Sequence, residues 1–519
     1  MLLPFGDPDG SRAPLDERSN EFVRLDQRFG AIGQSVEDFL RTRVIVGGQG
    51  TGKTVFLRRL HQHYLEEPSV NALPPVLETS ELDTETVIRF SQLFPQTTNS
   101  EKWSAIWRRA IELAAAEALL VDAERAHGSV SDTQMDALEG AVIRLGFPRV
   151  TDPVELAAYI CRTVQGASAF ETQVQHNDDW TVLARGFEGV LGSSREQYLF
   201  IDAIDDNYHY APAYWMACQR GLFYAVMQLM RRQATAHKLH AIITVRDLVM
   251  SSVYRSEHGA RYATDAAIAD LTWSWKAASE FLRSKVGALP RSLFRNPDAG
   301  DGLEEFMGRR EIFNAARERN EPIEQYLLRH SRLCPRDLIV LGNDLVALAD
   351  SHGILVADLT DEQIRQSVSS TSALFAHWNL AQAANQILTN IMPWNASRHD
   401  FARVYLSENE YSAETVVREI CSVLMTCGAE VFPNTALDAA EQEAGRRFGS
   451  GSYFADVMWQ NRVIGVVDDQ DRPVFYRMWR GQLGQIPVSE KYVVNPLFIE
   501  KLPGLLLNDG IRLNHKDLP

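Results

Sequence analysis

The sequence predicts an α/β fold in which a domain with a parallel sheet is followed by helical regions and a small C-terminal domain. Three short, almost continuous apolar runs support this prediction: "RVIV" at residues 43–46, "YLFI" at 198–201 and "AIITV" at 241–245. Such runs are typical of strands buried on both faces, as the strands of a parallel sheet are. Between and after them, long stretches carry apolar residues at helical spacing.

Length and composition bound the remaining possibilities. A chain of 519 residues is expected to form about two or three domains, and its 45% hydrophobic and 23% charged residues are typical of a soluble protein. No apolar run approaches the roughly 20 residues that span a bilayer, and the first residues lack the basic start of a signal peptide. The five cysteines are sparse and fit reduced thiols, so we expect a cytoplasmic protein without a membrane contact.

The formal net charge of −16 argues against nucleic acid as a partner, because such a surface repels phosphates on average. Basic residues cluster only in short fragments, such as Arg231-Arg232 and Arg446-Arg447. Binding of DNA or RNA would therefore need a local basic patch.

The stretch "GGQGTGKT" matches the phosphate-binding pattern G-x-x-x-x-G-K-[ST]. Glycines let consecutive backbone N–H groups converge on phosphate oxygens, and the N-terminus of the next helix adds its positive dipole end. In this pattern Lys53 reaches the β and γ phosphates, and the hydroxyl of Thr54 ligates Mg²⁺. A strand precedes the stretch and a helical apolar stripe follows it, which is the required context. The predicted nucleotide-binding residues are Gly47, Gly48, Gln49, Gly50, Thr51, Gly52, Lys53 and Thr54.

Acidic residues follow the second apolar run. Asp202 comes directly after the predicted strand, at the end of the strand where parallel sheets bind ligands. We expect its carboxylate to act on Mg²⁺, either as a ligand or through an intervening group. Asp205 and Asp206 come next, and either of them could orient or deprotonate an attacking water.

The third run ends in "TVRD", and the guanidinium of Arg246 could contact a γ-phosphate there. The alternative is an ion pair with a neighbouring acid such as Asp247. The N-K-x-D segment of Ras-type GTPases does not occur in the sequence, which favours adenine as the base. ATP and Mg²⁺ are therefore the expected ligands.

Taken in order, "GGQGTGKT", "LFIDAIDD" and "IITVRD" resemble the STAND class of P-loop NTPases, over about residues 20–345. The second motif is similar to the NACHT pattern of four apolar residues and D-G-L-D-E, and the third to the NB-ARC strand that ends in T-T-R-D. The resemblance implies an AAA+-related, ATP-driven switch of the kind used in immunity, signalling and phage defence. Asp206 stands where NACHT proteins carry glutamate, and the family's G-x-P-L segment is not evident.

The resemblance also gives roles to two residues of "LCPRDLIVLGNDL" (333–345). It implies that Pro335 packs near the base and that Arg336 reaches the phosphates as a second-sensor arginine. The alternative is an ordinary helix start, because proline suits a first helical turn.

The predicted organisation has five parts. These are a flexible arm at 1–20, a P-loop NTPase domain at 21–264 with a helical insertion at about 95–190, a helical lid at 265–350, a helical segment at 351–430 and a winged-helix-like domain at 431–519. The main insertion helix, at 100–126, carries Trp103, Ile106, Trp107 and Ile111 at helical spacing, and it serves either core packing or partner contact. A further strand is expected near 74–80, and a helix over 303–320.

The C-terminal prediction depends on two short helices, at about 434–449 and 450–460, followed by a hairpin in "NRVIGVVDD" and "RPVFYRMW". The second helix carries no lysine or arginine. We therefore expect it to dock on the rest of the protein or on a partner, through Tyr453, Phe454, Met458 and Trp459, and not to read DNA.

The leading hypothesis is an ATP-binding and ATP-hydrolysing switch that controls a separate effector or sensed protein. The switch could assemble into a homo-oligomer. The resemblance implies a role in prokaryotic antiviral defence. One alternative is an AAA+ initiator-like DNA-binding ATPase, which salt-sensitive DNA binding would distinguish. The other is a nucleotide-dependent scaffold without significant turnover, which depends on Asp205 and Asp206.

Overall fold

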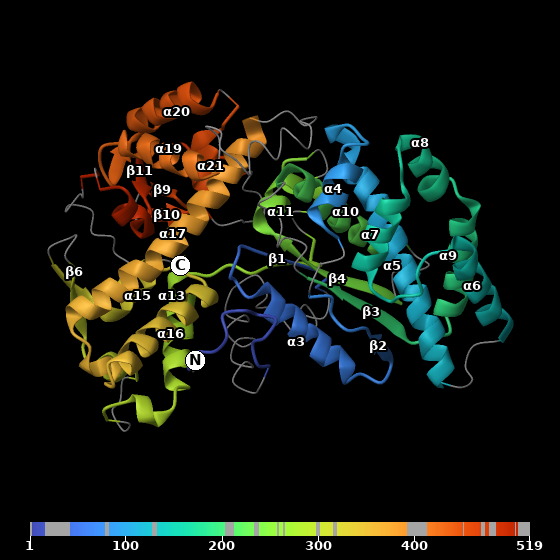
Figure 1. Ribbon diagram of the computed structural model, residues 1–519, viewed down its shortest axis with the longest axis horizontal. Coiled ribbons are helices and arrows are strands. Elements are labelled where there is room, and N and C mark those ends of the chain that lie inside the picture. Colours follow the sequence, from blue (N-terminus) through green and yellow to red (C-terminus); the bar gives the residue numbers. More distant parts are fainter. Residues whose placement is uncertain are drawn as a thin grey trace.

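The computed structural model describes residues 3–15, 42–77, 82–126, 132–202, 212–232, 238–256, 259–262, 265–296, 302–314, 319–391, 413–449, 451–468, 473–476, 484–503 and 505–506. Figure 1 shows the central sheet with the insertion helices on its right and the C-terminal helices and strands at the upper left. None of the helices described is both long and apolar enough to cross a membrane.

Within the described residues, the central sheet has five strands, all parallel, in the order β2-β3-β4-β1-β5. They are β1 (Val44–Gly47), β2 (Val70–Ala72), β3 (Glu196–Ile201), β4 (Leu239–Arg246) and β5 (Ile268–Asp270). The three apolar runs form β1, β3 and β4, which are almost fully buried. This confirms the predicted α/β fold. Because the strands run in one direction, β1, β3 and β4 all end at the same edge of the sheet, where Gly47 lies beside Arg246.

Two strands differ from the prediction. β2 ends before the segment expected at 74–80, because Pro74 and Pro75 have no N–H group for a ladder, and pairing resumes only at a single bridge between Val76 and Ile201. β5 lies beyond the predicted boundary at residue 264 and pairs with β1. The sheet therefore extends to Asp270, and its last strand is too short for an apolar pattern to reveal it.

Helices cover both faces of the sheet. On one face, α3 (Lys53–Leu65) packs its predicted stripe of Phe56, Leu57, Leu60 and Tyr64. On the other face lie α5 (Gln96–Ala126) and α10 (Pro212–Arg231), which pack on each other (Figure 1). Between β2 and β3 lie, besides α5, α4 (Thr84–Ser91), α6 (Asp132–Leu145), α7 (Pro153–Thr163), α8 (Ala167–Phe170), the π-helix η2 (Glu171–Gln175) and α9 (Asp178–Leu191). All but α4 fall within the predicted insertion.

The insertion helix α5 supports the core-packing alternative. It begins at Gln96, before the expected start, and its predicted apolar residues Trp103, Ile106, Trp107 and Ile111 are fully buried. The indole N–H of Trp107 donates to the carbonyl of Cys218 in α10 at 3.1 Å, which ties the insertion to the sheet-covering helix.

The region after the sheet is mostly helical. Its helices are α11 (Asp247–Tyr254), α12 (Gly259–Tyr262), α13 (Trp275–Gly287), the 3-10 helix η4 (Arg291–Leu293), α14 (Gly302–Met307), α15 (Ile323–Arg329), α16 (Pro335–Ser351), the 3-10 helix η5 (Val356–Asp358) and α17 (Asp361–Ile391). The helix expected over 303–320 is wrong in its second half, where β6 (Glu311–Asn314) pairs with β7 (Arg319–Pro322). Gly308 explains the break: its φ is +66°, and a Cβ there would lie 2.4 Å from the carbonyl oxygen of Ala357.

The described C-terminal elements are α19 (Ala413–Met425), β8 (Val431–Pro433), α20 (Asn434–Phe448), α21 (Phe454–Gln460), β9 (Ile464–Val467), β10 (Pro473–Phe475), β11 (Lys491–Val494) and the 3-10 helix η6 (Pro496–Lys501). The four strands described here form an antiparallel sheet in the order β10-β9-β11-β8. The expected hairpin is β9–β10. Phe454, Met458 and Trp459 are buried as expected of docking residues, whereas Tyr453, which precedes α21, is 61% exposed.

Candidate functional site

The glycine-rich loop (Gly47–Thr54) joins β1 to α3 at the edge where the strands end. Gly50 and Gly52 have φ angles of +80° and +97°, which favour glycine. Gly52 is the N-cap of α3, and the first turn of α3, which the structure describes in full, contains no acidic residue. The loop thus presents a helix N-terminus whose positive dipole end is not offset by a carboxylate in that turn.

The side chain of Lys53 folds back across the loop. Its Nζ donates to the carbonyl oxygens of Gly47 and Gly48, each at 3.1 Å, and the hydroxyl of Thr51 donates to the carbonyl of Gly48 at 2.9 Å. Trp273, just beyond β5, donates its indole N–H to the carbonyl of Thr51 at 3.0 Å. These bonds fix the loop and place an ammonium group at its mouth.

Two predicted site residues lie at the carboxyl ends of strands, at the same edge of the sheet as the loop, and β4 separates the strand of Asp202 from β1. Asp202 directly follows β3 and is 2% exposed, and its Oδ1 accepts a hydrogen bond from the hydroxyl of Thr244 in β4. Arg246 ends β4 beside Gly47 and is the N-cap residue of α11. Asp205 and Asp206 lie outside the described residues.

A carboxylate near the loop was not predicted as part of the site. Asp247, the first residue of α11, accepts from the N–H of Leu248 at 2.9 Å, and its Oδ2 would lie 3.3 Å from a Cβ built on Gly48. Sequence reasoning gives Asp247 only a role as a partner of Arg246. Asp247 comes directly after the end of β4, and this position is a sequence signal for a site residue because a parallel sheet binds its ligands at the carboxyl ends of its strands.

The start of α16 presses on the loop. Pro335 occupies its first turn and is buried. The backbone N–H of Arg336 donates to the carbonyl of Gly50 at 3.3 Å, and a Cβ on Gly50 would lie 3.0 Å from Arg336 Cβ and 3.1 Å from Cys334 Sγ. Arg336 thus lies next to the loop, as the second-sensor prediction requires, and the helix-start reading of Pro335 also holds.

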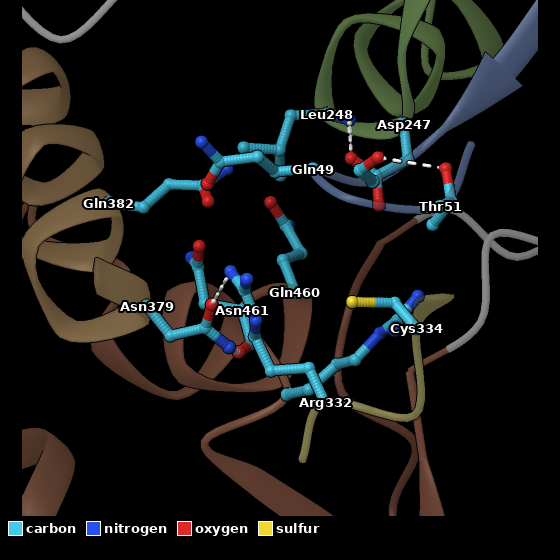
Figure 2. A pocket seen from close by; sticks show the side chains of 12 residues that line it. Gln49, Thr51, Asp247, Leu248, Arg332, Cys334, Asn379, Gln382, Gln460 and Asn461 are labelled. Atoms are coloured by element: carbon cyan, nitrogen blue, oxygen red, sulfur yellow. Dashed lines mark hydrogen bonds between the residues drawn. The ribbon is translucent and has the colours of Figure 1, made fainter. Parts of the chain in front are cut away.

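A pocket opens between the loop and the C-terminal elements (Figure 2). Five of its twelve lining residues are glutamine or asparagine, and these five come from three separate segments of the chain. The lining residues are Gly48, Gln49, Thr51, Asp247, Leu248, Arg332, Cys334, Asn379, Gln382, Gln460, Asn461 and Arg462.

Arg332, a cationic side chain that lines the pocket, forms a buried ion pair with Asp337. Arg332 is 8% exposed, and its Nε and Nη2 donate to the carboxylate of Asp337 at 2.9 and 2.6 Å. Burial by itself lowers the pKa of Arg332, but the adjacent Asp337 carboxylate more than offsets it, so the net effect is a raised pKa. The guanidinium also donates to Asn379 Oδ1 at 3.3 Å, so this neutralised pair connects the region before α16 to α17.

Polar bonds continue from α17 to the C-terminal elements. Asn379 Nδ2 donates to the carbonyl of Asn461 at 3.2 Å, Asn461 donates to Gln386 Oε1 at 2.8 Å, and Gln386 donates to Gln460 Oε1 at 2.6 Å. A buried bond between the hydroxyls of Ser251 in α11 and Tyr476 adds a second link. Burial raises the pKa of Tyr476 to about 12, although the Ser251 bond partly opposes this.

Few side chains could hold a metal ion at this site. Among the residues that the structure describes, no group of three or more His, Cys, Asp or Glu side chains is placed to hold an ion. Thr54 and Asp202 supply the oxygen donors that Mg²⁺ prefers, and a bound phosphate would have to complete such a site. All five cysteines are described and are free thiols, and burial raises the pKa of Cys334 to about 12.

Comparison with known protein families finds no family that matches the chain, and a search of curated proteins finds no significant match.

Proposed function

We propose that this chain is an ATP-binding switch of the P-loop NTPase type, in which residues 265–350 act as a lid and the C-terminal elements form a winged-helix-like unit. Nucleotide state would change the arrangement of these parts and so control a separate effector or sensed protein. Cytoplasmic location, which the sparse cysteines favour, and assembly into a homo-oligomer are parts of the proposal, and a role in prokaryotic antiviral defence comes from the resemblance to STAND ATPases.

The loop carries the proposal. Its left-handed glycines and helix N-terminus suit a phosphate, and Lys53 could exchange the carbonyl oxygens of Gly47 and Gly48 for phosphate oxygens. That exchange is favourable because a hydrogen bond between two charged groups is stronger than one to a carbonyl.

The donor set fits Mg²⁺, which would neutralise charge on the phosphates when bound. The Thr54 hydroxyl and the Asp202 carboxylate would hold it, and the bond from Thr244 fixes the orientation of Asp202. Asp205 or Asp206 would position the attacking water, and Arg246 and Arg336 would contact the phosphates from β4 and α16.

Coupling to the C-terminal elements is supported by the pocket. Gln49 and Thr51 of the loop share it with Gln460, the last residue of α21, and with Asn461, which follows that helix (Figure 2). A ligand that fills the loop would therefore meet side chains on which the docking of α21 depends. The order helix, strand, helix, helix, strand, strand in α19–β10 also fits a winged helix, and β11 adds one more strand.

Two observations argue against the initiator-like alternative. The basic pair before α21 is already neutralised, because Arg446 pairs with Glu443 and Arg447 pairs with both Glu443 and Glu419. The apolar face of α21 is buried inside the protein. Tight, salt-sensitive duplex binding by the whole chain would nevertheless favour that alternative.

An equilibrium titration with Mg-ATP tests the proposal. Lys53→Ala should abolish binding or weaken it by at least about a hundredfold, since a charged contact to the phosphates is worth several kcal/mol when lost. Lys276→Ala, on the exposed side of α13, is the matched control and should bind as the wild type does. Equal affinity in Lys53→Ala and wild type would show that the loop is not the site. Binding without turnover in the wild type would favour the scaffold alternative.

A further inference from the structure

Residues 3–15, here called the arm, are packed onto the protein, although their composition predicts a flexible segment. Phe5 is only 2% exposed. Its ring lies over Gly342 of α16, where a Cβ would come within 2.5 Å of it, and it meets Phe306 of α14 edge-on at 5.6 Å between ring centroids. The glycine thus forms a socket for the phenylalanine.

The backbone of the arm is recognised next to this socket. Asn343 Oδ1 accepts from the N–H of Phe5 at 3.0 Å, and Asn343 Nδ2 donates to the carbonyl of Gly6 at 3.0 Å. One amide side chain therefore satisfies a donor and an acceptor of consecutive residues. This geometry fixes both the position and the direction of the arm on α16.

The other half of the arm reaches the nucleotide loop's helix. Arg58 of α3 donates to the carbonyls of Gly10 and Ala13, each at 2.7 Å. A Cβ on Gly10 would lie 3.0 Å from Thr54 Cβ, so the arm touches the first turn of α3. Between the two halves, the carbonyl of Pro8 accepts from Arg336 Nε at 3.2 Å.

We propose that the arm is a latch that slows nucleotide exchange by tying α16 to the start of α3. This inference rests on the proposed function, because it assumes that ATP binds at the glycine-rich loop. The latch crosses from the socket at Gly342 to Thr54 and orients Arg336 on the way. Release of a nucleotide requires α16 to move away from Gly50, and a docked arm opposes that movement.

The release rate of a fluorescent ATP analogue tests the latch in the full chain. Phe5→Ala should release the analogue about tenfold faster, which corresponds to roughly 1.4 kcal/mol of lost docking energy. Leu3→Ala, which changes a 40% exposed side chain of the same arm, is the control and should leave the rate unchanged. In a chain that lacks residues 1–15, a peptide with the sequence of those residues should restore slow release, and the same peptide with Phe5→Ala should not.

Amide hydrogen exchange without nucleotide separates the latch from the proposed function. The first turns of α16 and α3 should exchange faster in Phe5→Ala than in Leu3→Ala. If the wild type binds no ATP, the proposed function fails and the exchange comparison alone decides whether the arm ties the two helices. Equal exchange in the two variants, or equal release rates with and without residues 1–15, would overturn the latch.

Discussion

Replacing Gly50 by alanine tests the contact between the glycine-rich loop and α16. Its φ of +80° costs an L-residue roughly 1–2 kcal/mol. The new Cβ would also lie 3.0 Å from Arg336 Cβ and 3.1 Å from Cys334 Sγ, which is closer than ordinary contact. Overpacking of this kind costs about 1–3 kcal/mol, so Gly50→Ala should lower the free energy of unfolding by about 2–5 kcal/mol in total.

Gly146→Ala is the matched control for the cost of placing an L-residue in a left-handed backbone conformation. Its φ is +68°, and among the described residues no heavy atom lies within 4 Å of a Cβ built there. It should lose only the roughly 1–2 kcal/mol of backbone strain. Urea unfolding of both variants gives the difference between them, and ATP titration should show weaker binding in Gly50→Ala alone. If Gly50→Ala loses no more stability than Gly146→Ala, α16 does not press on the loop and the argument that couples them is refuted.

Three further predictions concern turnover, docking and pH. Asp202→Asn should keep its affinity for ATP but hydrolyse ATP about a hundredfold more slowly, which is the usual effect of removing one group that stabilises charge in the transition state. A steady-state phosphate-release assay measures this rate. Trp459→Ala should lower the free energy of unfolding by about 3–5 kcal/mol in urea, because Trp459 is 1% exposed. Burial, with a smaller effect of Arg329, lowers the pKa of His330 well below its ordinary 6.5, so the unfolded state binds the extra proton and stability falls as pH drops below 6.5. Between pH 7.5 and 5.5 the wild type should therefore lose about 1.4 kcal/mol more than His330→Gln, and equal losses would contradict this assignment.

The sheet and the loop could be predicted because their signals are local. Apolar runs mark β1, β3 and β4, and the glycine spacing marks the turn that follows β1. Since parallel strands end at one edge, these local signals also place Asp202 and Arg246 at the same edge as the loop without any knowledge of the tertiary contacts.

The pocket and the arm could not be predicted because they depend on contacts between distant segments. Neither Asn379 nor Asn461 belongs to a sequence motif or a periodic pattern. The hydrogen bond between them forms only because α17 packs against α21. The socket for Phe5 is a glycine inside a helix, which a sequence presents only as a weak helix former. The strands β6 and β7 were missed because Gly308 breaks a helical pattern through its contact with Ala357.

Amide hydrogen exchange of the full chain with and without Mg-ATP tests whether nucleotide at the glycine-rich loop acts on the C-terminal elements, with Lys53→Ala as the control. We predict that ATP slows exchange in the glycine-rich loop and also changes exchange in α21 and residues 461–462, and that Lys53→Ala shows neither effect. Protection of the loop with no change in 454–462 would contradict the proposed coupling, and no effect of ATP anywhere in the wild type would contradict the nucleotide site itself.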